Sequence, residues 1–527
     1  MPLQKYGIFS PTMGLKEDFP SILLHEANMP DNQNAHVRWG EVHACKMRNV
    51  ALARVLISGA SYNPILKYHW FKKTDGNNYL FAFTKDEIYK WSGSAWITWS
   101  SGVGVGGEDD LSAVATHWSV ATYGNKVIAT NGINVVLVGD DGTQFTELGF
   151  EDGGIVYAVG KYCSNAQWLA VFENYLILGN VTDDGTVYPQ RIRWCDISDQ
   201  TTWDSGDADY ADLGGADHIT GFGQYRDFLI IFKDSSYHRL WLATNELIFG
   251  TAVMSREIGC QAGDSIVNAK NGDLYFMASD KTIREIQFGE VSQAIDPSLK
   301  NMPDSLISRI AGASILPYGE LWWSVPDGPG AANNNRVLTY KPDTKTWGDR
   351  DIEVSAFGNW NALTAAAFTW DTLYPTYKTW NEWGWEHWDT IEGLVGFEED
   401  IGSDYSGYSY TLHNSTLDNG TAFTSFFVLS TDLAEKKAIS TYKRLISMKL
   451  YFRKQMNGTV AVTYKRDTES AWQTLSTVNL DDQSSNAIQT ITVPCDIRAM
   501  NYQFKFSATQ PYNFLGVAFS YVMVGDR

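Results

Sequence analysis

The sequence predicts an all-β fold, a β-propeller of about six to seven blades with a C-terminal β-sandwich-like module. Helical periodicity is nearly absent, and short runs of Val, Ile, Tyr, Phe and Trp recur between polar turns. The turns contain Asn-Gly, Asp-Gly and Ser-Gly pairs, which adopt the positive φ of tight hairpins at low cost. These pairs are Asp75-Gly76, Ser92-Gly93, Asp141-Gly142, Asp184-Gly185, Asn271-Gly272, Asn419-Gly420 and Asn457-Gly458.

The expected strands form six groups of three or four, repeated every ~40–50 residues, which is the usual length of a propeller blade. The groups occupy residues 79–99, 119–138, 168–195, 219–241, 264–286 and 307–347. We expect a further blade from the N-terminal segment together with residues near 390–412. Bulky side chains fill the space between neighbouring blades, which accounts for the 20 Trp and 27 Tyr of the chain.

The strand pattern divides the chain into four regions. Residues 1–50 are expected to be an N-terminal extended segment, 51–358 the propeller blades, 359–419 a Trp-rich insertion with propeller closure, and 420–527 the β-sandwich module. The last region alternates cleanly between apolar and polar residues, as is typical of strands that have one buried and one solvent-exposed face. Its start contains the strongest helix candidate of the chain, Ser430–Ser440.

Six tryptophans crowd into the insertion and its approach. They are Trp360, Trp370, Trp380, Trp383, Trp385 and Trp388. Indoles stack on sugar rings, bury themselves in protein interfaces and pack in cores. The sequence leaves these three roles open.

The charge of the chain restricts its partners. It has 61 Asp and Glu against 41 Lys and Arg, a net charge of −20, which would repel phosphates. This excludes a nucleic-acid coat or a binder of anionic membranes. It is compatible with the lining of a channel through which DNA moves without binding. No signal peptide and no membrane-spanning segment are expected, since no window reaches the ~18 apolar residues of a membrane helix. The odd, widely spaced cysteines predict reduced thiols in a cytoplasmic product. They are Cys45, Cys163, Cys195, Cys260 and Cys495.

Motifs of catalysis are missing, so we predict that the protein is not an enzyme. We expect no catalytic, cofactor-binding or metal-binding residues and no cofactor. Gly102–Gly107 matches G-x-G-x-x-G but lies in no βαβ unit, and we interpret it as a loop. Asp204–Asp212 offers carboxylates for Ca²⁺ but lacks the Gly and Glu positions of an EF-hand. His36 and His43 have the spacing of metal ligands but no third partner.

Four motifs follow one another along the chain. They are Gly14–Pro20 with Asn34–Gly40, then Arg193–Asp204, then Leu229–Leu240 with Asp273–Ile283, and finally Val337–Trp347. In this order they resemble the tail nozzle proteins of short-tailed bacteriophages, also called tail hub or packaged-DNA stabilisation proteins. The likeness spans nearly the whole chain, although Val37 does not directly follow an Asn as it does in that family.

The resemblance implies a structural protein of the virion tail, assembled in the cytoplasm of the bacterial host. Such proteins form a homohexameric ring below the portal and the head–tail adaptor, and they serve as a platform for tail fibres or spikes. Viral DNA passes through the lumen during ejection without sequence-specific contacts. Acidic residues suit such a lumen, and our hypothesis places there the loop Gly102–Asp110 or the acidic group Glu398, Glu399, Asp400 and Asp404.

An alternative of a different class is a glycan-binding or glycan-degrading propeller that acts in host adsorption. A glycosidase would need two opposed carboxylates, and a lectin would use the tryptophans at residues 360–388. No motif separates these alternatives.

Overall fold

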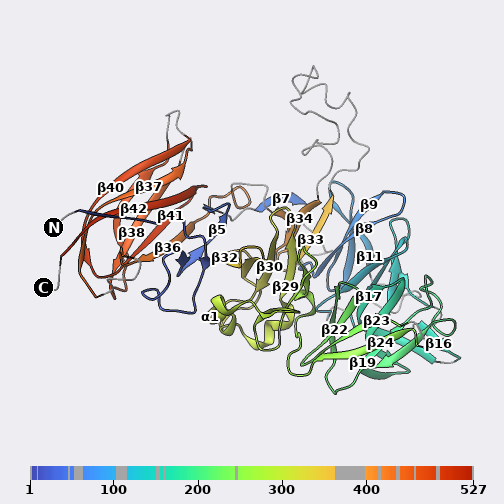
Figure 1. Ribbon diagram of the computed structural model, residues 1–527. Helices are drawn as coiled ribbons and strands as arrows, with labels where there is room; N and C mark the ends of the chain where they lie inside the picture. Colours follow the sequence, from blue (N-terminus) through green and yellow to red (C-terminus); the bar gives the residue numbers. More distant parts are fainter. Residues whose placement is uncertain are drawn as a thin grey trace, which may run out of the picture. The chain divides into compact units, whose positions relative to one another are not determined.

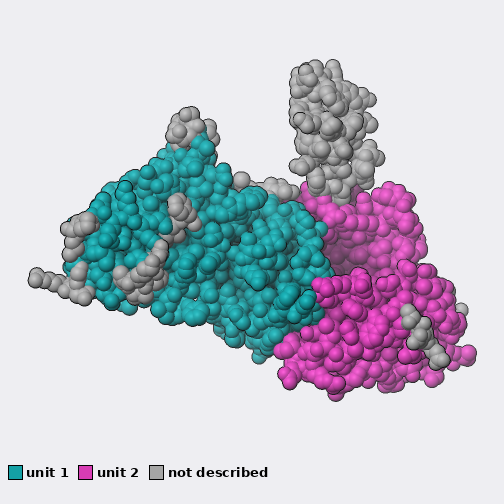
Figure 2. All heavy atoms as spheres, viewed as in Figure 1, with its two compact units in different colours: residues 1–49, 267–353, 413–527 teal, residues 50–266, 354–412 magenta. Residues whose placement is uncertain are grey.

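The computed structural model describes residues 3–8, 10–44, 48–52, 63–101, 115–149, 155–159, 161–243, 247–361, 398–412, 417–434, 440–455, 458–481 and 487–524. The chain forms two compact units (Figure 2). Unit 1 contains residues 1–49, 267–353 and 413–527, and unit 2 contains residues 50–266 and 354–412. The described elements are almost all strands, in antiparallel sheets that make an all-β propeller and a β-sandwich (Figure 1).

Unit 2 contains four sheets that succeed one another along the chain. The first is β8 (Lys67–Lys72), β9 (Asn78–Phe83), β10 (Glu87–Trp91) and β11 (Trp96–Ser101). The second is β12 (Ser119–Tyr123), β13 (Lys126–Thr130), β14 (Leu137–Gly139) and β15 (Thr146–Glu147). The third is β16 (Ile155–Ala158), β17 (Lys161–Phe172), β18 (Tyr175–Asp183), β19 (Thr186–Trp194) and β20 (Asp209–Asp212). The fourth is β21 (Ile219–Tyr225), β22 (Phe228–Lys233), β23 (Tyr237–Leu242) and β24 (Phe249–Ser255), followed by the 3₁₀ turn η1 (Gly263–Ser265).

A further sheet is closed by a strand from near the N-terminus. β33 (Ala356–Asn361), β34 (Glu398–Ser403) and β35 (Ser409–Leu412) are joined by β7 (Arg48–Leu52), which adds to β35. The sequence predicts that the N-terminal segment pairs with residues near 390–412. The pairing of β7 with β35 confirms this prediction.

Aromatic side chains fill the space between successive sheets of unit 2. Phe81 and Phe83 of β9 contact Phe145, which follows β14, with ring centroids 5.7 Å apart in both pairs. Trp118 packs on Phe83 at 5.3 Å. Such edge-to-face and tilted pairs are favoured arrangements of aromatic rings, so the many aromatic residues serve the packing between blades.

Unit 1 contains two more groups of four strands in succession, of which the first is a separate sheet and the second is one end of a ten-stranded sheet. One is β25 (Val267–Asn268), β26 (Leu274–Met277), β27 (Ile283–Glu285) and β28 (Gly289–Glu290). The other is β29 (Ala311–Ile315), β30 (Glu320–Val325), β31 (Arg336–Lys341) and β32 (Thr346–Arg350). Between them lie the short helices η2 (Gln293–Ile295), α1 (Asp296–Lys300) and η3 (Asp304–Arg309).

The C-terminal part of unit 1 is a β-sandwich to which the N-terminal segment adds strands. One sheet continues from β32, whose Asp349 pairs with Ala35, in the order β5 (Ala35–Arg38), β6 (Glu41–Ala44), β42 (Asn513–Met523), β37 (Lys443–Arg453) and β40 (Ile488–Ala499). Strand β1 (Gln4–Ile8) also pairs with β42. The other has the order β39 (Gln473–Asn479), β38 (Thr459–Arg466), β41 (Tyr502–Ala508), β36 (Ser425–Thr431) and β4 (Asn32–Gln33). A two-stranded pair, β2 (Gly14–Leu15) and β3 (Asn28–Met29), completes the segment.

The two sheets of the sandwich share one apolar core. Phe504 and Phe506 of β41 face Phe519 and Phe514 of β42, with ring centroids 5.3 and 5.2 Å apart. Because β1 pairs with β42 from Gln4↔Tyr521 onward, the two ends of the chain lie side by side (Figure 1).

The helix predicted at Ser430–Ser440 is wrong in its described part. Ser430 and Thr431 end strand β36, where they pair with Gln503 and Tyr502 of β41. Pairing with a strand more than seventy residues away overrides the local preference for a helix.

Candidate functional site

The hairpin of β5 and β6 presents the most exposed tryptophan among the described residues of unit 1. Its turn contains Trp39 at φ 50° and Gly40 at φ 77°, as a two-residue hairpin turn with positive φ at both positions requires. Glycine adopts positive φ without strain, whereas the same conformation costs a residue with a β-carbon about 1–2 kcal/mol. The indole of Trp39 is 81% exposed. The chain therefore holds a large apolar side chain in water on a strained turn.

Buried charges link this hairpin to the neighbouring strands β29–β32 of the same sheet. The Arg38 guanidinium donates to Glu320 Oε1 at 3.1 Å, and Arg350 lies 3.4 Å from Glu320 Oε2. Arg38 also stacks on the ring of Tyr318, 3.3 Å from its centroid. Burial favours the protonated form of Glu320, but the two guanidiniums outweigh it and hold the pKa of Glu320 below its ordinary value. These charges stabilise the fold, so they are not available as reactive groups.

The histidine pair predicted from spacing is brought together by the structure. His36 and His43 are cross-strand partners, with ring centroids 5.9 Å apart and nearly parallel planes. Burial lowers the pKa of His43, and the nearby Glu41 carboxylate, 3.8 Å from its Nε2, opposes this only in part. Among the described residues there is no group of three His, Cys, Asp or Glu side chains that fits a metal ion.

The aspartates of 204–212 have separate partners. Asp207 accepts from the Tyr175 hydroxyl at 2.8 Å, while Asp212 forms a bidentate ion pair with Arg191, at 2.7 and 2.8 Å. A calcium site needs several oxygens converging on one point. The loop is instead part of an edge strand, β20, and the turn before it.

The residues of the acidic group Glu398–Asp404 lie in strand β34 and in the turn after it, and they differ in burial. Glu398 faces solvent and pairs with Lys72 at 3.1 Å, whereas Asp400 is buried, with 8% exposure. Asp404 accepts backbone hydrogen bonds from Ser406 and Tyr408 and shapes the turn between β34 and β35. Asp400 is therefore not part of an exposed acidic surface, because its side chain is buried, and Asp404 is engaged in the turn.

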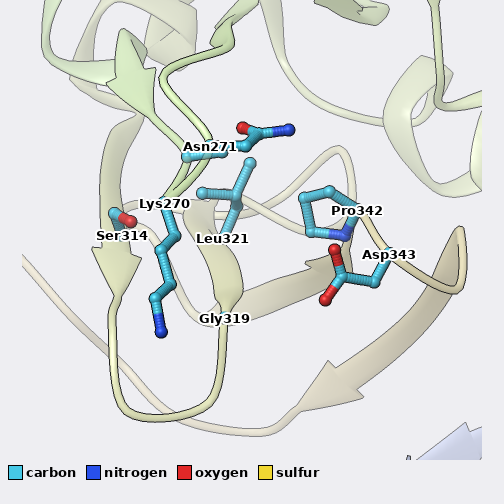
Figure 3. Close-up of a pocket in the computed structure, with 8 residues that line it drawn as sticks. Lys270, Asn271, Ser314, Gly319, Leu321, Pro342 and Asp343 are labelled. Atoms are coloured by element: carbon cyan, nitrogen blue, oxygen red, sulfur yellow. The ribbon is translucent and has the colours of Figure 1, made fainter.

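A pocket of about 180 Å³ lies between the turn after β25 and the hairpin of β29 and β30 (Figure 3). Figure 3 shows Lys270 to the left of Leu321, Asn271 above it, and Pro342 with Asp343 to its right. A second pocket, of about 630 Å³, lies in unit 2 and contains Asp217. Each pocket has one carboxylate in its lining, and a glycosidase needs two.

Several predicted features lie outside the described residues. These are the loop Gly102–Asp110 and the tryptophans Trp370, Trp380, Trp383, Trp385 and Trp388. Trp360 is described: it lies in β33 and packs edge-on against Trp91 at 6.3 Å, a contact typical of a core. Of the cysteines described, Cys163, Cys195 and Cys260 are buried free thiols.

Sequence reasoning missed the site formed by Arg38, Trp39, Glu320 and Arg350. A local signal existed, because Trp39-Gly40 stands between two alternating segments and so marks a hairpin. No signal in the sequence joins Arg38 to Glu320, which is 282 residues away.

Comparisons with known proteins give weak similarity only. No family model and no curated protein matches the chain. Among solved structures, the extracellular domain of a hybrid two-component system of B. thetaiotaomicron is 11% identical with a TM-score of 0.37, over 71% of this chain and 42% of that one. The chain thus spans less than half the length of that protein.

Two further solved structures have propeller or hydrolase descriptions. The Pan2 WD40 domain of Neurospora crassa is 8% identical with a TM-score of 0.34, over 67% of this chain and 90% of that one. A glycoside hydrolase family 43 arabinoxylan arabinofuranohydrolase from Bacillus subtilis is 11% identical with a TM-score of 0.24, over 98% and 100%. None of the helices in the described ranges has the length and apolarity needed to span a bilayer.

Proposed function

We propose that this chain is a structural protein of a short-tailed bacteriophage tail, a nozzle or hub that assembles as a ring of identical copies. The order of the sequence motifs supports this proposal. Two of the four motifs include paired blade strands. In the third motif, Leu229–Leu240 joins β22 to β23 and Asp273–Ile283 joins β26 to β27, and in the fourth, Val337–Trp347 joins β31 to β32. In this proposal the ring adjoins the portal and adaptor and bears fibres or spikes, and DNA passes through its lumen.

The use of charge also favours a structural role. Several buried charged groups of the described residues are paired in ways that fix strands, as in Arg38–Glu320–Arg350 and in the contacts of Asp183 with Arg191 and Arg193. An enzyme of the glycosidase class would instead present two carboxylates in one cleft. The net charge of −20 would keep a DNA duplex sliding along the wall of a channel.

The single observation on which the proposal depends is the exposed indole of Trp39. Large aromatic side chains at the centre of protein interfaces often contribute most of the binding energy. A strained backbone that displays such a side chain has a cost in the isolated chain, which a partner copy would offset. We therefore place Trp39 in the contact between neighbouring copies of the ring.

Electron microscopy and light scattering of the purified full chain test this proposal. We expect a closed ring with a central hole wide enough for a DNA duplex. Trp39→Ala should weaken the ring at least about tenfold in dissociation constant, as loss of an aromatic anchor does. The matched control is Phe288→Ala, which removes another exposed aromatic ring of unit 1, 74% exposed, and should leave the ring intact.

The outcomes distinguish the proposal from the glycan alternative. A strict monomer of 59.0 kDa at all concentrations would refute the ring. Release of oligosaccharide from host glycans by the purified chain would replace the structural role by an enzymatic one.

A further inference from the structure

The pocket of about 630 Å³ in unit 2 lies at one end of the sheet β21–β24, and the proposed ring assigns it no role. The end of β22, the start of β23 and the end of β24 meet there, because neighbouring antiparallel strands alternate in direction. The segment just before β21 forms the opposite wall. The lining includes Asp217, Ser235, Ser236, His238, Val253 and Arg256. A volume of roughly 300–1,000 Å³ suits a small ligand.

A buried ion pair lies beside this pocket and includes its lining residue Asp217. The Lys233 side chain is 0% exposed, and its Nζ lies 2.7 Å from Asp217 Oδ1 and donates to the Gly214 carbonyl oxygen at 2.9 Å. Burial alone would raise the pKa of Asp217, but Lys233 and the Ser236 hydroxyl outweigh it and hold that pKa well below its ordinary value. The carboxylate is therefore ionised and its charge is balanced by Lys233.

The two serines beside Asp217 present acceptors to the pocket. The hydroxyl of Ser236 donates to Asp217 Oδ2 at 2.8 Å, and that of Ser235 donates to the same atom at 3.1 Å. A hydroxyl has one proton to donate and keeps lone pairs to accept with. The Ser235 and Ser236 oxygens are thus poised to receive hydrogen bonds from hydroxyl groups of a ligand.

A cation and an imidazole complete the lining. The exposed guanidinium of Arg256 has no ion-pair partner within the described part of the chain. His238 is buried, with 4% exposure, and the described residues make no hydrogen bond to its ring nitrogens. The charges of Lys233 and Asp217 cancel each other, so Arg256 makes the pocket locally positive. The chain as a whole has a net charge of −20.

We propose that this pocket binds an acidic sugar of the uronic-acid type. Its carboxylate would pair with Arg256, its hydroxyls would donate to Ser235 and Ser236, and its ring would cover His238 and Val253. A neutral sugar would leave Arg256 without a counter-charge, and inorganic phosphate has no ring to cover His238 and Val253. The combination of a carboxylate with adjacent hydroxyls therefore fits the lining best.

Saturation-transfer NMR titration of the full chain with D-glucuronate tests this inference. We expect saturable binding with a dissociation constant near ~1 mM, and affinities at least about tenfold lower for D-glucose and for inorganic phosphate. Arg256→Gln should lower the affinity for glucuronate about tenfold, since charge-assisted hydrogen bonds to a carboxylate are strong. Arg256 is exposed, so this variant should unfold at the wild-type temperature.

Arg239→Gln is the matched control. Arg239 is an exposed arginine of the same sheet whose guanidinium lies over Phe228 and Trp241, outside the pocket, and its variant should bind glucuronate as the wild type does. Absence of saturation up to about 20 mM glucuronate, equal binding of glucose, or unchanged affinity in Arg256→Gln would each overturn the inference.

Titration with a trimer of galacturonate distinguishes the two possible sources of the ligand, an acidic polysaccharide and a free sugar acid. Markedly tighter binding of the trimer would identify an acidic polysaccharide, and equal binding would identify a free sugar acid; both results uphold the site. The titration is independent of the ring, because a monomeric chain that binds glucuronate would refute only the proposed assembly.

Discussion

Replacing the buried carboxylate Asp400 by Asn should stabilise the protein, and more so at higher pH. Burial raises the pKa of Asp400 to about 7 from an ordinary value of 3.8, and the neighbouring Glu398 adds to the effect. Between these values the folded chain keeps a proton that the unfolded chain releases. Stability is therefore lost as pH rises through this window, and the loss is complete above the folded pKa.

The size of the effect follows from the difference between the two pKa values. Each pH unit in the window costs about 1.4 kcal/mol, so the loss is roughly 2 kcal/mol at pH 5 and about 4 kcal/mol at pH 8. Asn has the shape of the protonated acid but no charge to bury. The gain in unfolding free energy from Asp400→Asn should thus roughly double between these two pH values.

Urea unfolding followed by tryptophan fluorescence at about pH 5 and pH 8 measures this gain. Glu398→Gln is the control, since it neutralises a solvent-facing acid of the same strand and leaves Asp400 in place. It should keep most of the pH dependence of the wild type. If Asp400→Asn instead unfolds in parallel with the wild type at both pH values, the argument that Asp400 is protonated in the fold is refuted.

Two further predictions concern the hairpin of β5 and β6. Glu320→Gln should destabilise unit 1 by about 3 kcal/mol in urea unfolding, because Arg38 and Arg350 would be left buried without a counter-charge. An unchanged midpoint would show that these arginines are solvated. Trp39→Asn should raise the unfolding free energy by about 1 kcal/mol, since Asn adopts positive φ more readily than Trp. A loss of stability would mean that the indole contributes packing within the chain.

The local features of the fold could be predicted from the sequence because short-range chemistry determines them. Gly76 and Gly272 have φ of 87° and 85°, and Asp184 with Gly185 has 50° and 72°, as the turn pairs suggested. Alternation of apolar residues located the strands on either side, since a strand exposes one face to the core. These two signals are sufficient for an all-β fold with blades of about four strands.

The long-range pairing could not be predicted in the same way. Strand β4 is two residues long and pairs with β36, nearly four hundred residues later. Neither its length nor its composition marks it as a strand, and only the partner supplies its hydrogen bonds. Asp400 illustrates the same limit, because a carboxylate in a sequence is expected in water and its burial depends on strands that cover it from elsewhere.

The proposed ring makes a final prediction about salt. Each copy has a net charge of −20, so neighbouring copies repel one another, while an indole such as Trp39 binds through apolar burial that salt does not weaken. Raising the salt from about 10 to 150 mM shortens the screening length from about 30 to 8 Å and removes much of this repulsion. The fraction of chain in rings, measured by light scattering at fixed protein concentration, should therefore rise with salt. A fall would show that ion pairs hold the copies together, and the contact would then have to be placed away from Trp39.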